Sequence, residues 1–173
     1  MTLEQALALA NFLAVVGGLT FAGFQVRQGR KALEQSAEAH KADHAWHRQI
    51  AAQEALAQYS TSVYLSRLAK EFNYLEIGRS ACVDLDLVEE RFKAEPDLRQ
   101  DLHALLNFYE SLARGVIQGL YDEDVIKAAR KGAMERAYTG FKCYIDARRK
   151  TGSPKAWLDL QVLIERWESS EPK

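Results

Sequence analysis

The chain has 173 residues, which is enough for one membrane-spanning segment and one domain of about 145 residues with a real hydrophobic core. Its 23 Lys and Arg residues nearly balance its 24 Asp and Glu residues, so a basic surface for a polyanion is missing. This balance excludes nucleic acid as a primary partner. The two cysteines, Cys82 and Cys143, lack metal-ligand spacing, and the sequence favours free thiols in a reducing compartment over a disulfide.

The first predicted element is a helix over residues 5–26, a segment without any charged side chain. At a rise of about 1.5 Å per residue this helix is roughly 33 Å long, enough to cross a hydrocarbon core of about 30 Å. Asn11 and the many Ala and Gly residues weaken the drive for insertion, so a buried helix of a soluble domain is the alternative. We predict a transmembrane helix over residues 1–26, with the lipid bilayer as a partner.

The charges that flank this segment predict its orientation. Glu4 is the only charged side chain before it, whereas Arg27, Arg30 and Lys31 follow immediately. The positive-inside rule then places the N-terminus outside and the C-terminal domain in the cytoplasm. We therefore expect a single-pass protein of the inner membrane.

Small residues recur along one face of the predicted transmembrane helix. Ala10, Ala14, Gly18 and Ala22 are four positions apart, and Asn11 lies at the edge of the same face. Small residues at this spacing let two helix backbones approach closely in lipid, and an Asn side chain can bond to its copy on a second chain. These five residues predict a homo-oligomer. The alternative is that small residues are simply common in transmembrane helices.

A helical stalk is predicted after the transmembrane segment. From Val26 to about Leu75 the chain has no proline and only one glycine, so the helix should continue without a break. Residues 27–54 are too polar for a packed core and are expected to form a solvated stalk. Apolar residues then recur at helical spacing, which predicts a cytoplasmic helical domain over residues 55–173.

Capping residues predict the first helices of this domain. Asp84 or Asp86 can cap a short helix, and Pro96 fits the first turn of a long helix that ends at Gly119. The long helix is the expected centre of the core, because its apolar residues share one face. These residues are Leu98, Leu102, Leu105, Leu106, Tyr109, Leu112 and Val116.

Two further helices are expected to complete the domain. Asp122 can cap a helix that runs to Gly152, and Ser153-Pro154 can start a closing helix. No strand or hairpin pattern competes with these helices. The predicted fold class is all-α, with an N-terminal transmembrane helix that continues into a long stalk and then a compact helical bundle.

The second half of the chain carries a pattern that resembles an uncharacterised bacterial family. The pattern consists of Leu105-Leu106-Asn107-Phe108-Tyr109-Glu110, followed by Ala113, Gly115, Gly119 and Asp122-Glu123, with the later pairs Ala156-Trp157 and Arg166-Trp167. The resemblance covers about residues 95–168, and it departs at Tyr138, where tryptophan is expected. It implies a single-span protein of the bacterial inner membrane with a C-terminal helical domain. It implies no catalytic residue.

Three histidines on one face of the stalk are a candidate metal site. His40, His44 and His47 have i, i+4, i+7 spacing and could present imidazoles to one metal ion, with Asp43 of neighbouring chains completing the coordination. No glutamate follows His40, so the HExxH pattern of zinc peptidases is absent. The alternatives are a solvated, pH-responsive helix face and a polar seam in a coiled coil.

A second polar group is predicted on the long central helix. Asn107, Glu110 and Arg114 lie about one turn apart, so Glu110 can pair with Arg114. Such a group forms either a network that sets helix packing or the wall of a small-ligand pocket. Motifs for nucleophilic catalysis and phosphate loops are lacking, so we expect no enzyme and no cofactor.

These features predict a membrane-anchored, non-enzymatic scaffold, tether or sensor component. Its cytoplasmic helical domain is expected to bind a protein partner, and the transmembrane helix and stalk are expected to promote self-association. The alternative function is a metal- or pH-responsive membrane module that uses His40, His44 and His47.

Overall fold

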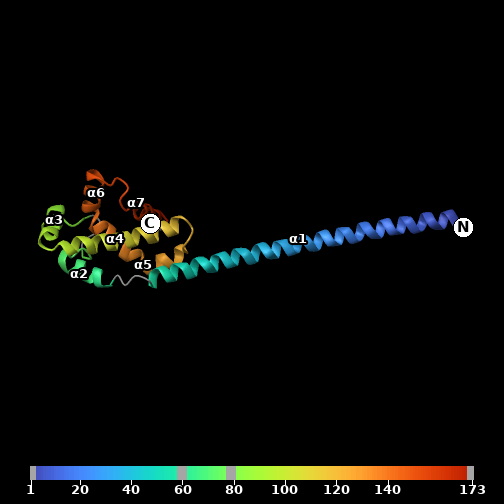
Figure 1. The fold of residues 1–173 in the computed structure, drawn as a ribbon, viewed down its shortest axis with the longest axis horizontal. Coiled ribbons are helices and arrows are strands. Elements are labelled where there is room, and N and C mark those ends of the chain that lie inside the picture. The colour runs from blue at the N-terminus through green and yellow to red at the C-terminus, as the bar shows by residue number, and fades with distance from the viewer. Residues whose placement is uncertain (1–2, 58–61, 77–80, 171–173) are drawn as a thin grey trace. The chain divides into compact units, whose positions relative to one another are not determined.

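The computed structural model describes residues 3–57, 62–76 and 81–170, and all regular elements in these ranges are helices. The all-α class is therefore confirmed. The chain divides into two compact units, Met1–Trp46 and His47–Lys173. Figure 1 shows the first helix, α1 (Leu3–Ala57), as one continuous ribbon and α4 running through the helical second unit.

The long helix predicted from the N-terminal region is shorter than expected at its C-terminal end. It ends at Ala57, and a separate helix, α2, occupies Ser62–Phe72. The second unit begins at His47 and not at residue 55, because Ala52 is already fully buried in the core. Part of the predicted stalk thus belongs to the packed unit.

The transmembrane helix predicted over residues 1–26 is not supported by the structure. Over the residues that the structure describes, no helix is both long enough and apolar enough to cross a membrane. The side chains of Ala10, Asn11, Ala14 and Ala22 lie outside the described residues. Gly18 is described, and a methyl group added there would meet no atom within 4 Å. Oligomer contacts through these five residues remain a prediction.

The predicted helix starts at Asp84, Pro96 and Asp122 are confirmed. Helix α3 (Leu85–Ala94) follows Asp84, whose carboxylate accepts a hydrogen bond from the Asp86 backbone N at 3.1 Å. Helix α4 (Pro96–Ile117) has proline in its first turn, and α5 (Glu123–Gly140) follows Asp122, which accepts from the Val125 N at 3.1 Å. Each cap satisfies a backbone N–H that the helix itself leaves unpaired.

The helix predicted from Asp122 to Gly152 is in fact two helices, α5 and α6 (Lys142–Thr151). The corner between them is fixed by a distant segment of the chain. The carbonyl of Gly140 accepts a hydrogen bond from the Val83 N at 2.8 Å, and a Cβ on Gly140 would lie 3.0 Å from the Cβ of Tyr74. A Cβ at this distance would be tighter than most real Cβ contacts, so glycine suits this close approach at the end of α5.

The start predicted for the last helix was also wrong. Helix α7 (Leu158–Ser169) starts after Trp157 and not at Pro154. Trp157 has a φ of 52° and a ψ of 39°, which is the left-handed region and cannot continue a right-handed helix. The residues from Gly152 to Trp157 therefore form a connection between α6 and α7.

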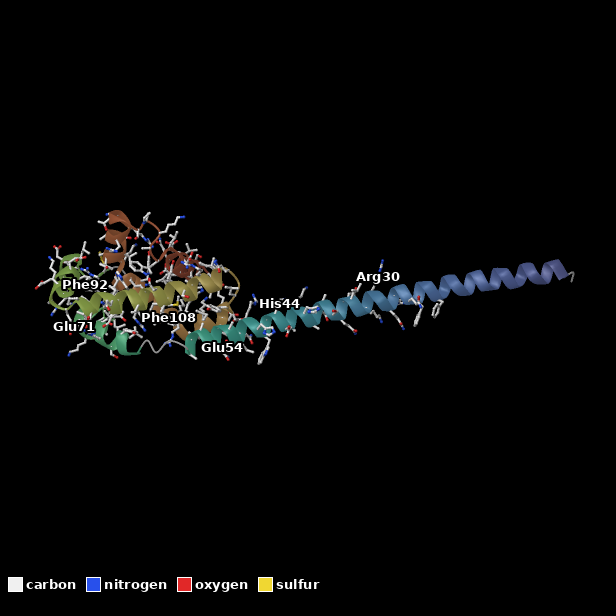
Figure 2. All side chains as sticks on the ribbon, viewed as in Figure 1. Arg30, His44, Glu54, Glu71, Phe92 and Phe108 are labelled. Carbon is white, nitrogen blue, oxygen red and sulfur yellow. A yellow bond between two sulfur atoms is a disulfide. The ribbon has the colours of Figure 1, made fainter. Side chains whose placement is uncertain are left out.

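Helix α4 is the centre of the core, as its apolar face predicts. It contacts α2, α3, α5 and α7, and all seven apolar residues named for it in the sequence are buried. Phe92 of α3 and Phe108 of α4 lie within this unit (Figure 2). Because the apolar face of α4 is fixed by these neighbours, its polar face has a fixed direction as well.

Cys82 and Cys143 form a disulfide, with their Cα atoms 5.9 Å apart. The prediction of two free thiols is therefore wrong. The bond joins the segment before α3 to the first turn of α6, at a sequence separation of 61 residues. Val83 and Gly140, which flank the bond, share the backbone hydrogen bond described above, so the same contact brings the two sulfur atoms together.

Replacing Tyr109 with phenylalanine is expected to leave the free energy of unfolding unchanged or to raise it by up to about 1 kcal/mol. Tyr109 is fully buried, burial raises its pKa to about 12, and its hydroxyl has no partner among the described residues. Removing an unpaired buried hydroxyl costs no hydrogen bond. Urea unfolding measures this difference.

The matched control is Tyr144→Phe, which removes a hydroxyl that lies 2.7 Å from the Nε2 atom of His103. This variant should lose about 1 kcal/mol. Equal losses for both variants would show that Tyr109 has a partner in solution.

Candidate functional site

A cleft of about 340 Å³ lies between one face of α4 and the connection from α6 to α7. It contains all three members of the polar group that the sequence singles out on the central helix. Its lining consists of His103, Asn107, Glu110, Arg114, Arg148, Ser153, Lys155, Ala156 and Trp157.

One stripe of α4 forms the first wall of the cleft. His103, Asn107, Glu110 and Arg114 have i, i+4, i+7, i+11 spacing and therefore share a helix face. The buried apolar face of α4 holds the helix so that this stripe is turned toward the connection. Three of these residues were predicted from the sequence and His103 was not, although its spacing of four residues to Asn107 was a usable signal.

Trp157 forms the second wall and is held by a hydrogen bond across the cleft. Its indole Nε1 donates to the Oδ1 of Asn107 at 2.9 Å, and only 8% of the residue is exposed. A left-handed backbone at a bulky residue costs on the order of 1–3 kcal/mol and persists only where the surroundings hold it. Such positions are concentrated at functional sites.

Arg149 fixes the connection that carries Trp157. Its Nε donates to the carbonyl oxygen of Ala156 at 2.8 Å, and its Nη2 donates to the carbonyl oxygen of Trp157 at 3.1 Å. A third bond runs from Nη1 to the Oε1 of Gln161 on α7 at 2.6 Å. One guanidinium on α6 thus joins the connection to α7 and makes this wall rigid.

Glu110 is used to cap α7 from another helix. Its Oε1 accepts a hydrogen bond from the Asp159 N at 3.3 Å, and its Oε2 accepts from the Leu160 N at 2.8 Å. Arg114 lies 3.5 Å from Glu110 and donates from Nε to Asp159 at 2.9 Å. Glu110 and Arg114 therefore take part in a packing network and also line the cleft.

His103 lies at the inner end of the cleft among aromatic rings. Its Nε2 is 2.7 Å from the hydroxyl of Tyr144, and its ring centroid is 5.6 Å from that of Trp157. Burial lowers the pKa of His103, and the positive charges of Arg148 and Arg99 lower it further. The imidazole is therefore neutral near pH 7.

A family model of a domain of unknown function, DUF4760, matches residues 12–167 of this chain. The chain belongs to the DUF4760 family. No curated protein and no solved structure matches it. The matched range includes every residue that lines the cleft. An uncharacterised family was expected from the sequence, and the particular motif of residues 106–110 and the membrane anchor remain predictions.

The mouth of the cleft in this DUF4760 domain is positively charged. Arg148 and Lys155 are exposed, and within the described part of the chain neither forms an ion pair with a carboxylate. The only acid in the lining is Glu110, whose two oxygen atoms are engaged by backbone N–H groups and Arg114. Arg148 comes from the last turn of α6 and Lys155 from the connection that follows, so no helical spacing in the sequence relates either cation to the stripe on α4.

The stalk histidines of the DUF4760 protein lie apart from this cleft in the sequence. His40, His44 and His47 are exposed on α1, and Figure 2 shows His44 extending outward from the helix. Among the described residues, no group of three His, Cys, Asp or Glu side chains could hold a metal ion. A site completed by a second chain remains a prediction.

Proposed function

We propose that this DUF4760 protein is a non-enzymatic, membrane-anchored sensor component whose helical domain binds a small anionic ligand in the cleft. The observation that carries the proposal is the pair of cations at the mouth, Arg148 and Lys155, which have no carboxylate partner among the described residues. Two cations that face one cleft without a counter-charge favour an anion between them.

The remaining lining supports binding of an anion in a defined orientation. Asn107 uses its Oδ1 for the indole of Trp157, so its amide NH₂ group stays available as a donor. Ser153 adds a hydroxyl, and Trp157 adds an apolar wall. A cleft of about 340 Å³ lies within the usual range for small-molecule sites.

The same geometry favours binding over catalysis. The carboxylate of Glu110 is committed to the N-terminus of α7 and is a poor candidate for a general base. The neutral imidazole of His103 already contacts the hydroxyl of Tyr144 at 2.7 Å. We assign these two residues structural roles in shaping the site.

The proposal also includes a membrane anchor at the N-terminus and a protein partner. The uncharged segment of residues 5–26 and the cations that follow it favour a single span of the bacterial inner membrane with the domain in the cytoplasm. Ligand binding between α4 and the α6–α7 connection would then be reported to a protein partner at the membrane surface.

Calorimetric titration of the purified full chain with inorganic phosphate, and separately with succinate, tests the binding site. Whichever of the two anions binds the wild type more tightly should bind the Arg148→Gln, Lys155→Gln double variant at least about ten-fold more weakly. The reason is that this variant lacks two charge-assisted hydrogen bonds. Lys150→Gln is the matched control, since it removes an exposed cation of α6 that does not line the cleft.

The control variant should bind within about two-fold of the wild type. If Lys150→Gln weakened anion binding equally, the loss of affinity would reflect the overall charge of the domain and not the cleft. If the wild type showed saturable binding to neither anion, the proposed function would be refuted.

A further inference from the structure

The disulfide is attached to α6, the helix that contributes Arg148 to the lining of the cleft. Cys82 and Cys143 are both half-buried, so the bond is not enclosed in the core. Cys143 belongs to the first turn of α6, and Cys82 precedes the cap of α3. The bond therefore joins the segment before α3 to α6, beside the Val83–Gly140 backbone hydrogen bond and the ring contact between Phe92 and Tyr144.

Helix α6 is short and is held by contacts with its neighbours. It has ten residues, its N-cap residue Phe141 provides no side-chain cap, and only Tyr144 and Ile145 of the helix are buried. Isolated helices of this length are marginal in water, so α6 depends on contacts with its neighbours. The bond at Cys143 is one of those contacts.

Helix α6 also carries three groups that shape the cleft. Tyr144, directly after Cys143, contacts His103 of α4 through its hydroxyl. Arg148 lines the cleft one turn later, and Arg149 holds the backbone of the connection that ends in Trp157. A shift of the first turn of α6 thus changes both walls.

We propose that the Cys82–Cys143 disulfide is a reversible redox lock that sets the affinity of the cleft for its anion. The proposal rests on the proposed function of the cleft. In the cytoplasm, which is the proposed location of the domain, permanent disulfides are rare and those that form are usually redox-sensing. The oxidised form, with α6 held in place, is the form that binds tightly.

The chemistry requires a dithiol reductant. One thiolate of the reductant attacks a sulfur of the Cys82–Cys143 bond and forms a mixed disulfide, and the other protein sulfur leaves and is protonated. The second thiol of the reductant then displaces the remaining protein sulfur. Two electrons pass to the protein, which ends with two thiols, and the reductant ends as a disulfide.

The test compares the full chain in three forms: oxidised, reduced with dithiothreitol, and carrying Cys82→Ser with Cys143→Ser. Phosphate titration should show that the reduced and double-serine forms bind about five-fold more weakly or worse. Reoxidation of the wild type should restore binding. Equal affinity in all forms of a chain that binds phosphate would overturn the lock and leave the proposed function intact.

Hydrogen exchange provides a readout that does not need a ligand. Reduction should speed exchange of the backbone amides of α6 and leave those of α4 protected. If phosphate bound no form of the chain, the proposed function would fail, and faster exchange confined to α6 would still establish the lock on the helix. Unchanged exchange in α6, or equal acceleration in α4 and α6, would overturn it.

Thiol trapping in intact cells decides whether the bond is reversible. The two cysteines should be found reduced in growing cells and oxidised after mild treatment with a thiol oxidant. Complete oxidation under every condition would identify a permanent structural disulfide and overturn the switch.

Discussion

Replacing Trp167 with alanine is expected to lower the free energy of unfolding by about 3–5 kcal/mol. Trp167 of α7 is the largest fully buried side chain among the described residues. Its indole Nε1 donates to the Oε1 of Glu123 at 2.8 Å, so the substitution removes packing and a hydrogen bond to a carboxylate together. Urea unfolding followed by near-ultraviolet circular dichroism reports the packing of the aromatic core and gives this value.

Trp46→Ala is the matched control for this experiment. Trp46 lies on α1 and is 60% exposed, so its loss leaves no cavity. Its variant should differ from the wild type by no more than about 0.5 kcal/mol. Similar losses for the two variants would mean that α7 is not packed in solution as it is in this structure.

Breaking the Cys82–Cys143 bond is expected to lower the free energy of unfolding of the domain by about 4 kcal/mol. The bond closes a loop of 61 residues, and the loss of loop-closure entropy in the unfolded chain gives a value of about this size. Urea unfolding of the wild type with and without dithiothreitol measures it. A difference below about 1 kcal/mol would contradict the entropic account.

The variant with Cys82→Ser and Cys143→Ser separates the bond from the reagent. It should match the reduced wild type within about 1 kcal/mol, and dithiothreitol should not change it further. A domain whose total stability lies in the usual range of about 5–15 kcal/mol would remain folded after this loss. Reduction can therefore act on α6 while the core persists.

The helix starts of the domain could be predicted because their causes are local. Asp84 and Asp122 accept hydrogen bonds from backbone N–H groups two and three residues ahead, and proline in the first turn of α4 needs no distant partner. The apolar face of α4 is equally local, because its spacing follows the helical repeat. These features lie within a few residues of each other in the chain.

The features that were predicted wrongly depend on residues that are far apart in the sequence. Tyr74 and Val83 contact Gly140 at the end of α5, and Cys143 pairs with Cys82 beside the same contact. Capping and periodicity rules cannot predict such contacts, because they compare residues that are close together in the sequence. The expected helix break at Gly152 was located correctly, but the one at Gly140 was missed.

One wall of the cleft depends on local spacing in the sequence, and the other depends on contacts between distant segments. Its first wall was visible as the spacing of Asn107, Glu110 and Arg114, although the sequence left open whether these residues form a network or a pocket. The second wall depends on Trp157, whose left-handed backbone is held by Arg149 and whose indole is held by Asn107.

The sequence by itself determined the helical class, the caps, the buried face of α4 and the polar stripe on its other side, because each depends on side chains within a few turns of one another. Only the tertiary structure decided where α5 ends and α6 begins, and that Cys82 pairs with Cys143. It also decided that Arg148 and Lys155 lie beside that polar stripe. The physical reason is that these depend on contacts between segments tens of residues apart, whose partners are chosen by the packing of the whole core.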